Sequence, residues 1–271
     1  MKRLSIESGA FAAVLWRSIA ALAMMVPAFV LQRRRWPRGD VLRLHLVRGL
    51  AAGGSVLLFF WGMARVAMAQ AVAITFLAPL LAIFLAAAML GERVRVAAYV
   101  GSGIAALGVL VIAAGEVSAR ASTAAVLGTA AIFLASLLYA ASLVLLRRQA
   151  QAAGPLEVVL FASLVIGAAM LPAAPWAASW PAPAQLPAII AAAALGTVSA
   201  LLIAWAYARA EAQLLAPVEY TAFVWAALFG WLAFGERVSG WTLAGAVLIV
   251  AGCAVAVRRR PAAAPLTEAA A

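Results

Sequence analysis

The sequence predicts an all-α membrane protein, a polytopic bundle of about nine transmembrane helices in two inverted-topology repeats. Three observations lead to this fold class. The 271-residue chain is 68% hydrophobic and 11% charged, with a mean hydropathy of +1.08, whereas soluble domains are roughly 45–50% apolar and about 25% charged. Its apolar residues form runs of about 20, the length of a helix that crosses a bilayer. The motif GERV occurs twice, at Gly91–Val94 and Gly235–Val238.

Nine apolar runs are candidate spans, and short connections join them. A spanning helix satisfies its backbone hydrogen bonds internally, which lipid requires. The first run ends in Arg33–Arg35 and is too long for the apolar part of a signal peptide, so we expect it to be retained. The nine runs are approximately 10–31, 44–63, 69–90, 96–115, 125–146, 157–175, 186–206, 212–234 and 239–257.

Basic residues are divided unequally between the two sides on which the connections fall. Thirteen lie on one side and five on the other, and the richer side is expected to be cytoplasmic. The C-terminus is then inside and the N-terminus outside. Arg17 and Arg48 fall inside spans and are not counted.

The two GERV copies are 144 residues apart, and Gly101 with Gly245 and Gly108 with Gly252 share that offset. Five runs separate the copies. Because five is odd, the copies face opposite sides of the membrane, as in transporters whose binding site lies near the midplane between two inverted halves. We expect a first repeat over 1–116 with four spans, a second over 117–257 with five, and a cytoplasmic tail over 258–271.

Both halves contain a proline-bearing span that ends in Gly-Glu and is followed by a glycine-rich span. These segments, ITFLAPLLAIFLAAAMLGERV (74–94) and APVEYTAFVWAALFGWLAFGERV (216–238), resemble the EamA-type family of the drug/metabolite transporter superfamily. The resemblance implies a bacterial inner-membrane carrier with two five-helix repeats. Since only four spans precede Glu116, we expect the family's first helix to be missing from this chain.

Ionisable residues and prolines inside spans are candidates for function. Glu219 could bind a cationic group or carry a proton, or it could reach the interface. Arg17 could pair with Glu219, bind a substrate carboxylate, or mark a helix end near the outer interface. Pro79 and Pro217 indicate either broken helices at a binding site or tolerated kinks.

Polar and aromatic residues recur on single helix faces and could line a cavity for a small amphipathic solute. Ordinary packing and interfacial belts of Trp and Tyr would give the same pattern. A stripe of small residues that includes Gly108 and Gly245 indicates close helix packing, or a homodimer face. The candidate substrate-binding set is Glu219, Tyr220, Trp225, Tyr139, Ser142, Trp61, Gln70, Thr75, Pro79, Ser199, Trp205, Tyr207 and Arg17.

Each GERV copy is expected to separate two helices. Gly91 and Gly235 suit the left-handed conformation that ends a helix. Glu92 and Glu236 would then sit at the N-terminus of the following helix, where a carboxylate is favourable.

Several functional classes lack their residues. The single cysteine excludes an intramolecular disulfide and multi-thiolate metal sites, and the single histidine, His45, in or beside a loop, excludes His-pair zinc motifs. No phosphate-binding GxxxxGK[ST] loop occurs. We expect no cofactor, no metal and no nucleic-acid partner, because the +11 charge gathers in loops as in membrane proteins. The expected partners are a small-molecule substrate and the lipid bilayer.

The sequence therefore predicts a secondary transporter of small metabolites that works by alternating access, and the resemblance to the EamA-type family implies an exporter of amino-acid-like or amphipathic solutes. A truncated or non-transporting membrane subunit is the alternative. A membrane-embedded enzyme is less well supported, since paired carboxylates or a nucleophile with its base are lacking.

Overall fold

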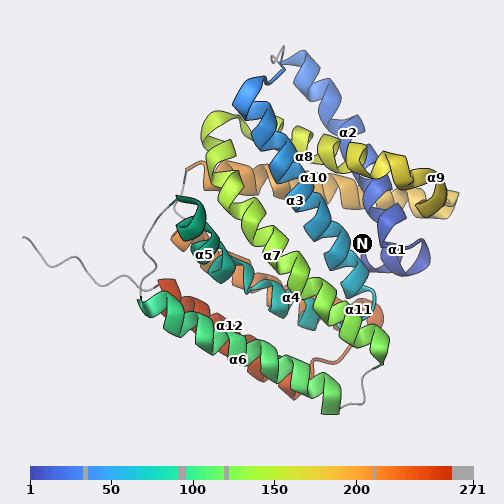
Figure 1. The fold of residues 1–271 in the computed structure, drawn as a ribbon. Helices are drawn as coiled ribbons and strands as arrows, with labels where there is room; N and C mark the ends of the chain where they lie inside the picture. Colours follow the sequence, from blue (N-terminus) through green and yellow to red (C-terminus); the bar gives the residue numbers. More distant parts are fainter. Residues whose placement is uncertain (33–35, 91–95, 119–121, 210–211, 258–271) are drawn as a thin grey trace, which may run out of the picture.

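The computed structural model describes residues 1–32, 36–90, 96–118, 122–209 and 212–257, and every regular element within them is helical (Figure 1). Five of these helices are long and apolar enough to cross a membrane, and shorter apolar helices accompany them. The predicted all-α membrane fold is confirmed. The helices are α1 Lys2–Glu7, α2 Ala10–Leu31, α3 Gly39–Met63, α4 Met68–Thr75, α5 Ala78–Leu90, α6 Val96–Ser118, α7 Thr123–Ala152, α8 Pro155–Met170, α9 Ala174–Ala177, α10 Leu186–Tyr207, α11 Ala212–Phe234 and α12 Gly240–Val257, with short 3-10 turns at Leu171–Ala173 and Pro183–Gln185.

One predicted span, 69–90, is two helices rather than one. The chain leaves α4 at Phe76 and Leu77, whose amides donate to carbonyls three residues back, at 3.2 Å each. Pro79 then lies in the first turn of α5. A proline lacks an N–H, and its ring clashes with helical backbone in the preceding turn, so the helix is interrupted just before Pro79. In the other half α11 runs through Pro217 without a break, so the prolines do not interrupt corresponding spans.

The interruption leaves carbonyls that lipid could not satisfy, and neighbouring helices contribute donors to them. The Cys253 thiol of α12 donates to the carbonyl of Phe76 at 3.3 Å. The Ser136 hydroxyl of α7 lies 3.4 Å from the carbonyl of Ile74. Irregular backbone at membrane depth requires partners of this kind.

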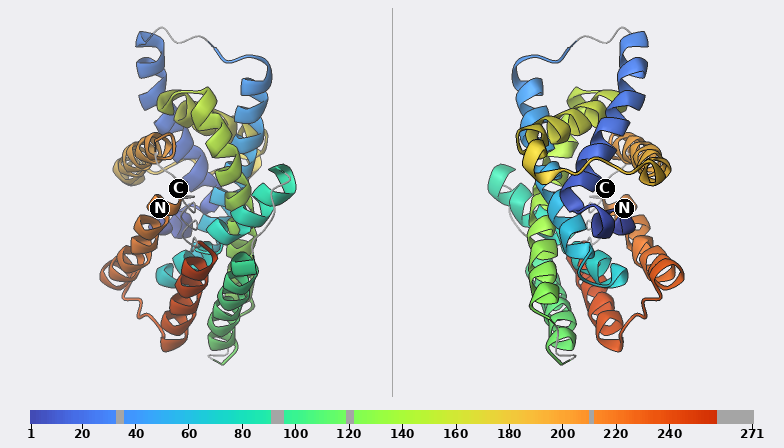
Figure 2. Two further views of the ribbon diagram at one scale, coloured as in Figure 1. Left: turned by 90° about the vertical axis from the view of Figure 1, so that its left-hand side faces the viewer. Right: turned by 90° about the vertical axis from the view of Figure 1, so that its right-hand side faces the viewer.

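Helices from the two halves of the chain pack side by side. Helix α6 lies along α12, α3 lies along α7, and α2 and α10 pack with α8 (Figures 1 and 2). Between α6 and α12 the backbones touch: a Cβ added at Gly108 would lie 2.6 Å from the carbonyl oxygen of Gly245. The small-residue stripe is therefore filled from inside the molecule, by the last helix of the second half.

The second GERV copy confirms one expectation and corrects another. Gly235 has φ +66°, the left-handed conformation expected after α11. The carboxylate of Glu236, however, does not sit on the following helix, because Ser239 caps α12 by accepting from the amide of Thr242 at 3.0 Å. Glu236 Oε2 accepts from the amide of Met68 at 2.8 Å and so caps α4, in the other half. The first copy lies outside the described residues.

Glu236 also pairs with the buried Nζ of Lys2. That ammonium donates to the carbonyl of Val66 at 2.7 Å and lies 5.3 Å from the ring centre of Phe234. Helix α1, the start of α4 and the end of α11 are thus joined around one carboxylate.

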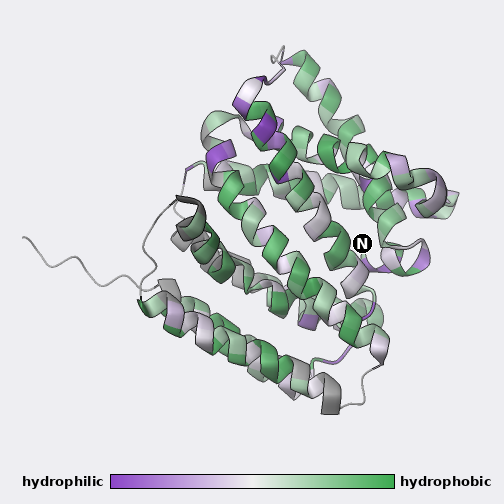
Figure 3. Ribbon diagram, in the orientation of Figure 1, coloured by the Kyte–Doolittle hydropathy of each residue, from purple (hydrophilic) through white to green (hydrophobic). Residues whose placement is uncertain are grey.

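The surface separates by polarity (Figure 3). Hydrophilic residues gather at the end formed by the start of α3 and the end of α7, where Arg38, Arg43 and Arg148 are exposed. Large apolar side chains face outward elsewhere, including Leu110, Leu195 and Leu232, each more than 60% exposed. An apolar exterior of this extent is stable only against lipid.

Candidate functional site

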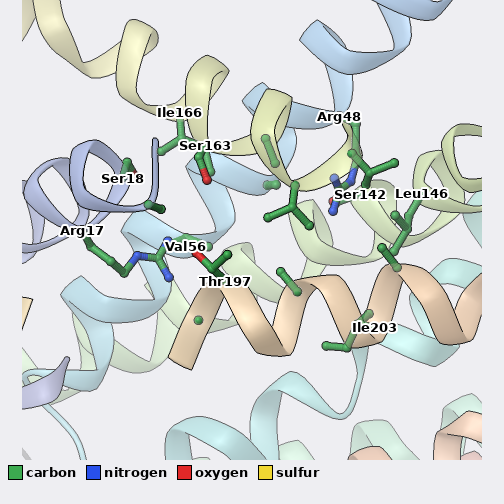
Figure 4. A pocket seen from close by; sticks show the side chains of 18 of the residues that line it. Arg17, Ser18, Arg48, Val56, Ser142, Leu146, Ser163, Ile166, Thr197 and Ile203 are labelled. Atoms are coloured by element: carbon green, nitrogen blue, oxygen red, sulfur yellow. The ribbon is translucent and has the colours of Figure 1, made fainter. Parts of the chain in front are cut away.

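A cavity of about 220 Å³ lies where α2, α3, α7, α8 and α10 meet (Figure 4). Its walls are mainly apolar, with Val56 of α3, Ile166 of α8 and Ile203 of α10 among them. Hydroxyls interrupt these walls at Ser142, Ser163 and Thr197. An apolar enclosure with a few polar groups is the usual form of a small-molecule site.

Two arginines face this cavity. Arg17 comes from α2 and Arg48 from α3, and Figure 4 shows them on opposite sides of Val56 and Thr197. The Nε and Nη1 atoms of Arg48 are shielded from solvent and have no hydrogen-bond partner in the structure. Arg17 lies over the ring of Phe60, 6.0 Å from its centre. Cations inside a span are costly, so their presence makes this cavity the candidate functional site.

A buried polar cluster adjoins the cavity one turn before Arg48. His45 is fully buried in α3; its Nε2 lies 3.1 Å from Glu157 Oε1, and its Nδ1 meets the amide of Gln149. The ring also stacks on Phe161, with centres 4.6 Å apart. The expectation that His45 lies in or beside a loop is wrong, because α3 begins at Gly39 rather than near residue 44.

Of the predicted site residues, the cavity contains Arg17, Tyr139 and Ser142. Gln70 and Thr75 are near the interrupted helix instead. The Gln70 amide donates to the Thr129 hydroxyl at 3.2 Å, and the Thr75 hydroxyl to the carbonyl of Val72 at 2.6 Å.

Two further candidates face outward. Ser199 is exposed, and Trp225 is exposed and stacks on Phe229. Pro79 contributes to the backbone interruption described above, but its side chain lies outside the described residues, as do those of Tyr207, Glu219 and Tyr220.

Trp61 and Trp205 occupy equivalent places near the ends of α3 and α10. In each case the arginine four residues later, Arg65 or Arg209, stacks over the indole and donates to the tryptophan's carbonyl oxygen. The stacking distances are 3.5 and 4.6 Å. Amphipathic rings with a neighbouring cation are typical of membrane interfaces.

Arg48, Ser163 and Thr197 line the cavity but were not among the predicted residues. Arg48 carried the same signal as Arg17, an ionisable group inside an apolar run. The two hydroxyls carried no comparable signal, since single Ser and Thr residues are common in such helices. Within the described ranges no group of His, Cys, Asp and Glu is arranged to hold a metal ion.

The sequence profile of the EamA-like transporter family matches residues 1–114 and 126–258. The chain belongs to the EamA-like transporter family. The two matches cover nearly all of the sequence and confirm the two repeats. Membership of the EamA-like family makes this a multi-pass membrane protein of the drug/metabolite transporter type, and members of the family are transporters rather than enzymes.

A search of curated proteins finds no match. Among solved structures, one crystal structure, whose title assigns no function, is 24% identical. The alignment covers 94% of this chain and 92% of that one, with a TM-score of 0.62. At this identity the likeness bears on the fold alone, and it agrees with the EamA-like assignment.

Proposed function

We propose that this protein is a secondary transporter that exports small amino-acid-like or amphipathic metabolites across the bacterial inner membrane. The observation that carries the proposal is the cavity, because both family matches contribute walls to it. Helices α2 and α3 come from the first matched range, and α7, α8 and α10 from the second. A site between two halves can open to each side in turn if the halves rock around it.

The cavity's composition suits an amphipathic solute. Apolar side chains would surround the body of the solute, while arginine and hydroxyl groups would orient its polar end. We propose that the arginine-rich end is cytoplasmic, following the distribution of basic residues.

Efflux from liposomes tests the proposal. The purified chain is reconstituted into liposomes loaded with a defined mixture of labelled amino acids and small organic acids, and released solutes are measured by mass spectrometry. At least one solute should leave faster than from protein-free liposomes. Thr197→Trp, which fills the cavity, should abolish this efflux, whereas Val198→Trp, at a 55% exposed neighbour on α10, should preserve it.

Two results would overturn the proposal. One is release no faster than from protein-free liposomes for every solute, which favours a non-transporting subunit. The other is equal efflux from wild type and Thr197→Trp, which would place the pathway elsewhere.

A further inference from the structure

The cavity holds two positive charges that the described protein does not neutralise. Among the residues that the structure describes, no carboxylate pairs with Arg17 or Arg48. The acids whose side chains are described are engaged elsewhere. These pairs are Glu7 with Arg3, Asp40 with Arg43, Glu157 with His45, and Glu236 with Lys2.

The hydrogen-bonding state of Arg48 indicates an absent partner. A guanidinium has five N–H donors and no acceptor. The Nε and Nη1 donors of Arg48 are inaccessible to solvent and unbonded. A buried polar group without a partner is unfavourable. Arg48 lines the cavity, so a small rotation of its side chain toward an anion held there would give these donors acceptors.

The side chains of the cavity indicate which class of anion it can hold. A carboxylate matches the planar fork of a guanidinium and accepts two parallel hydrogen bonds. The hydroxyls of Thr197, on the Arg17 side, and Ser142, beside Arg48, line the same cavity and can donate to an anion on either side. The remaining walls, such as Val56, Ile166 and Ile203, suit an apolar body.

We propose that the substrates are small organic carboxylates with an apolar body, held through Arg17 and Arg48. This inference rests on the proposed transport function and specifies its substrate class. Cationic amphipathic solutes are excluded by the same two charges, because like charges in a low-dielectric enclosure repel strongly.

Matched probes test the charge requirement. Phenylacetate and 4-methylpentanoate are compared with their neutral amides, phenylacetamide and 4-methylpentanamide, and with cationic 2-phenylethylamine. Binding is measured as the rise in Tm of the purified full chain. The single buried cysteine, Cys253, reports unfolding by reacting with a thiol-sensitive dye. The acids should raise Tm saturably, and the amides should need at least about tenfold higher concentrations, since a charge-assisted bond is lost.

Variants assign the effect to the cavity. Arg48→Gln and Arg17→Gln should each weaken the response to the acids by about tenfold or more. Arg43→Gln, an exposed arginine of the same helix as Arg48, should keep it. The ligand-free Tm of Arg48→Gln should equal or exceed that of wild type, because an unpaired buried charge is removed. That comparison separates lost binding from failed folding.

The proposal is overturned if neither acid raises Tm, if amides or the amine act as well as the acids, or if Arg48→Gln responds like wild type. It is also overturned if Arg48→Gln lowers the ligand-free Tm, since Arg48 would then support the fold. Binding of acids without efflux would contradict transport but leave the anion site intact. Efflux restricted to cations would support transport and contradict the anion site.

Discussion

The chain's single histidine lies where three helices meet. With the Gln149 amide donating to Nδ1, the imidazole carries its proton on Nε2 and donates it to Glu157. One ring thus connects α3, α7 and α8, the helices that form one side of the cavity. Such a cluster restrains the segment of α3 that carries Arg48, because each partner holds the ring.

Replacing the acid of this cluster should destabilise the protein. Glu157→Ala leaves the buried Nε2–H without an acceptor and should cost about 1–3 kcal/mol of unfolding free energy. Glu157→Gln keeps an acceptor oxygen and should cost less. Thermal unfolding of the purified chain measures both.

Asp40→Ala, at a fully exposed acid in the first turn of α3, is the control and should lower Tm much less than Glu157→Ala, because exposed charge contacts contribute little. A Tm for Glu157→Ala equal to that of wild type would show that the cluster contributes nothing to stability.

Individual site residues were only partly predictable from sequence. An arginine within an apolar run is recognisable whatever it contacts, and Arg17 was predicted on that basis. The environment of His45 was not, because its partners Gln149 and Glu157 are more than 100 positions away in sequence. Trp61 and Trp205 fitted a cavity and an interface equally well, and their contacts with Arg65 and Arg209 are of the kind found at an interface.

At the scale of elements, glycines decide how closely α6 and α12 approach. A Cβ added at Gly108 would lie 2.6 Å from the carbonyl oxygen of Gly245, and one added at Gly245 would lie 2.5 Å from the carbonyl oxygen of Gly108. Contacts this short cannot hold a methyl group, so the two helices must separate if either glycine is replaced. Gly103 also lies on α6, but a Cβ added there would have no atom within 4 Å.

The pair Gly108→Ala and Gly103→Ala isolates this effect. Gly108→Ala should destabilise by about 1–3 kcal/mol through overpacking. Gly103→Ala should be neutral or slightly stabilising, since alanine favours helix over glycine. Thermal unfolding of both variants tests the contrast. Equal Tm values would contradict close contact between α6 and α12.

The positions of the helices could be predicted from hydropathy, but the helix break and the contacts between helices could not. The apolar runs predict nearly all the helices because length and composition suffice. At the interruption, the Phe76 carbonyl accepts from the thiol of Cys253, 177 positions away, and a one-dimensional pattern cannot assign such a partner. Glu236 was expected to cap a helix and does, but it caps α4 of the other half.

For the whole molecule, the repeated sequence accounts for the arrangement. The 144-residue offset of the GERV copies also relates Trp61 to Trp205 and Arg65 to Arg209, so the same helix end is built twice. The first GERV copy follows α5 and the second follows α11, so the five predicted spans between the copies correspond to α6, α7, α8, α10 and α11. This odd count is why two like sequences make halves of opposite orientation around one cavity.

Access to the cavity from both sides of the membrane is the most direct measure of transport by alternating access. Ser163 lines the cavity, and Cys253 is the chain's only cysteine. In Cys253→Ser protein carrying Ser163→Cys, a membrane-impermeant thiol reagent is added to one face of oriented vesicles and then, in separate samples, to the other. Alternating access predicts reaction from both faces, with both rates reduced by phenylacetate. Reaction from one face only, or from neither, would contradict it.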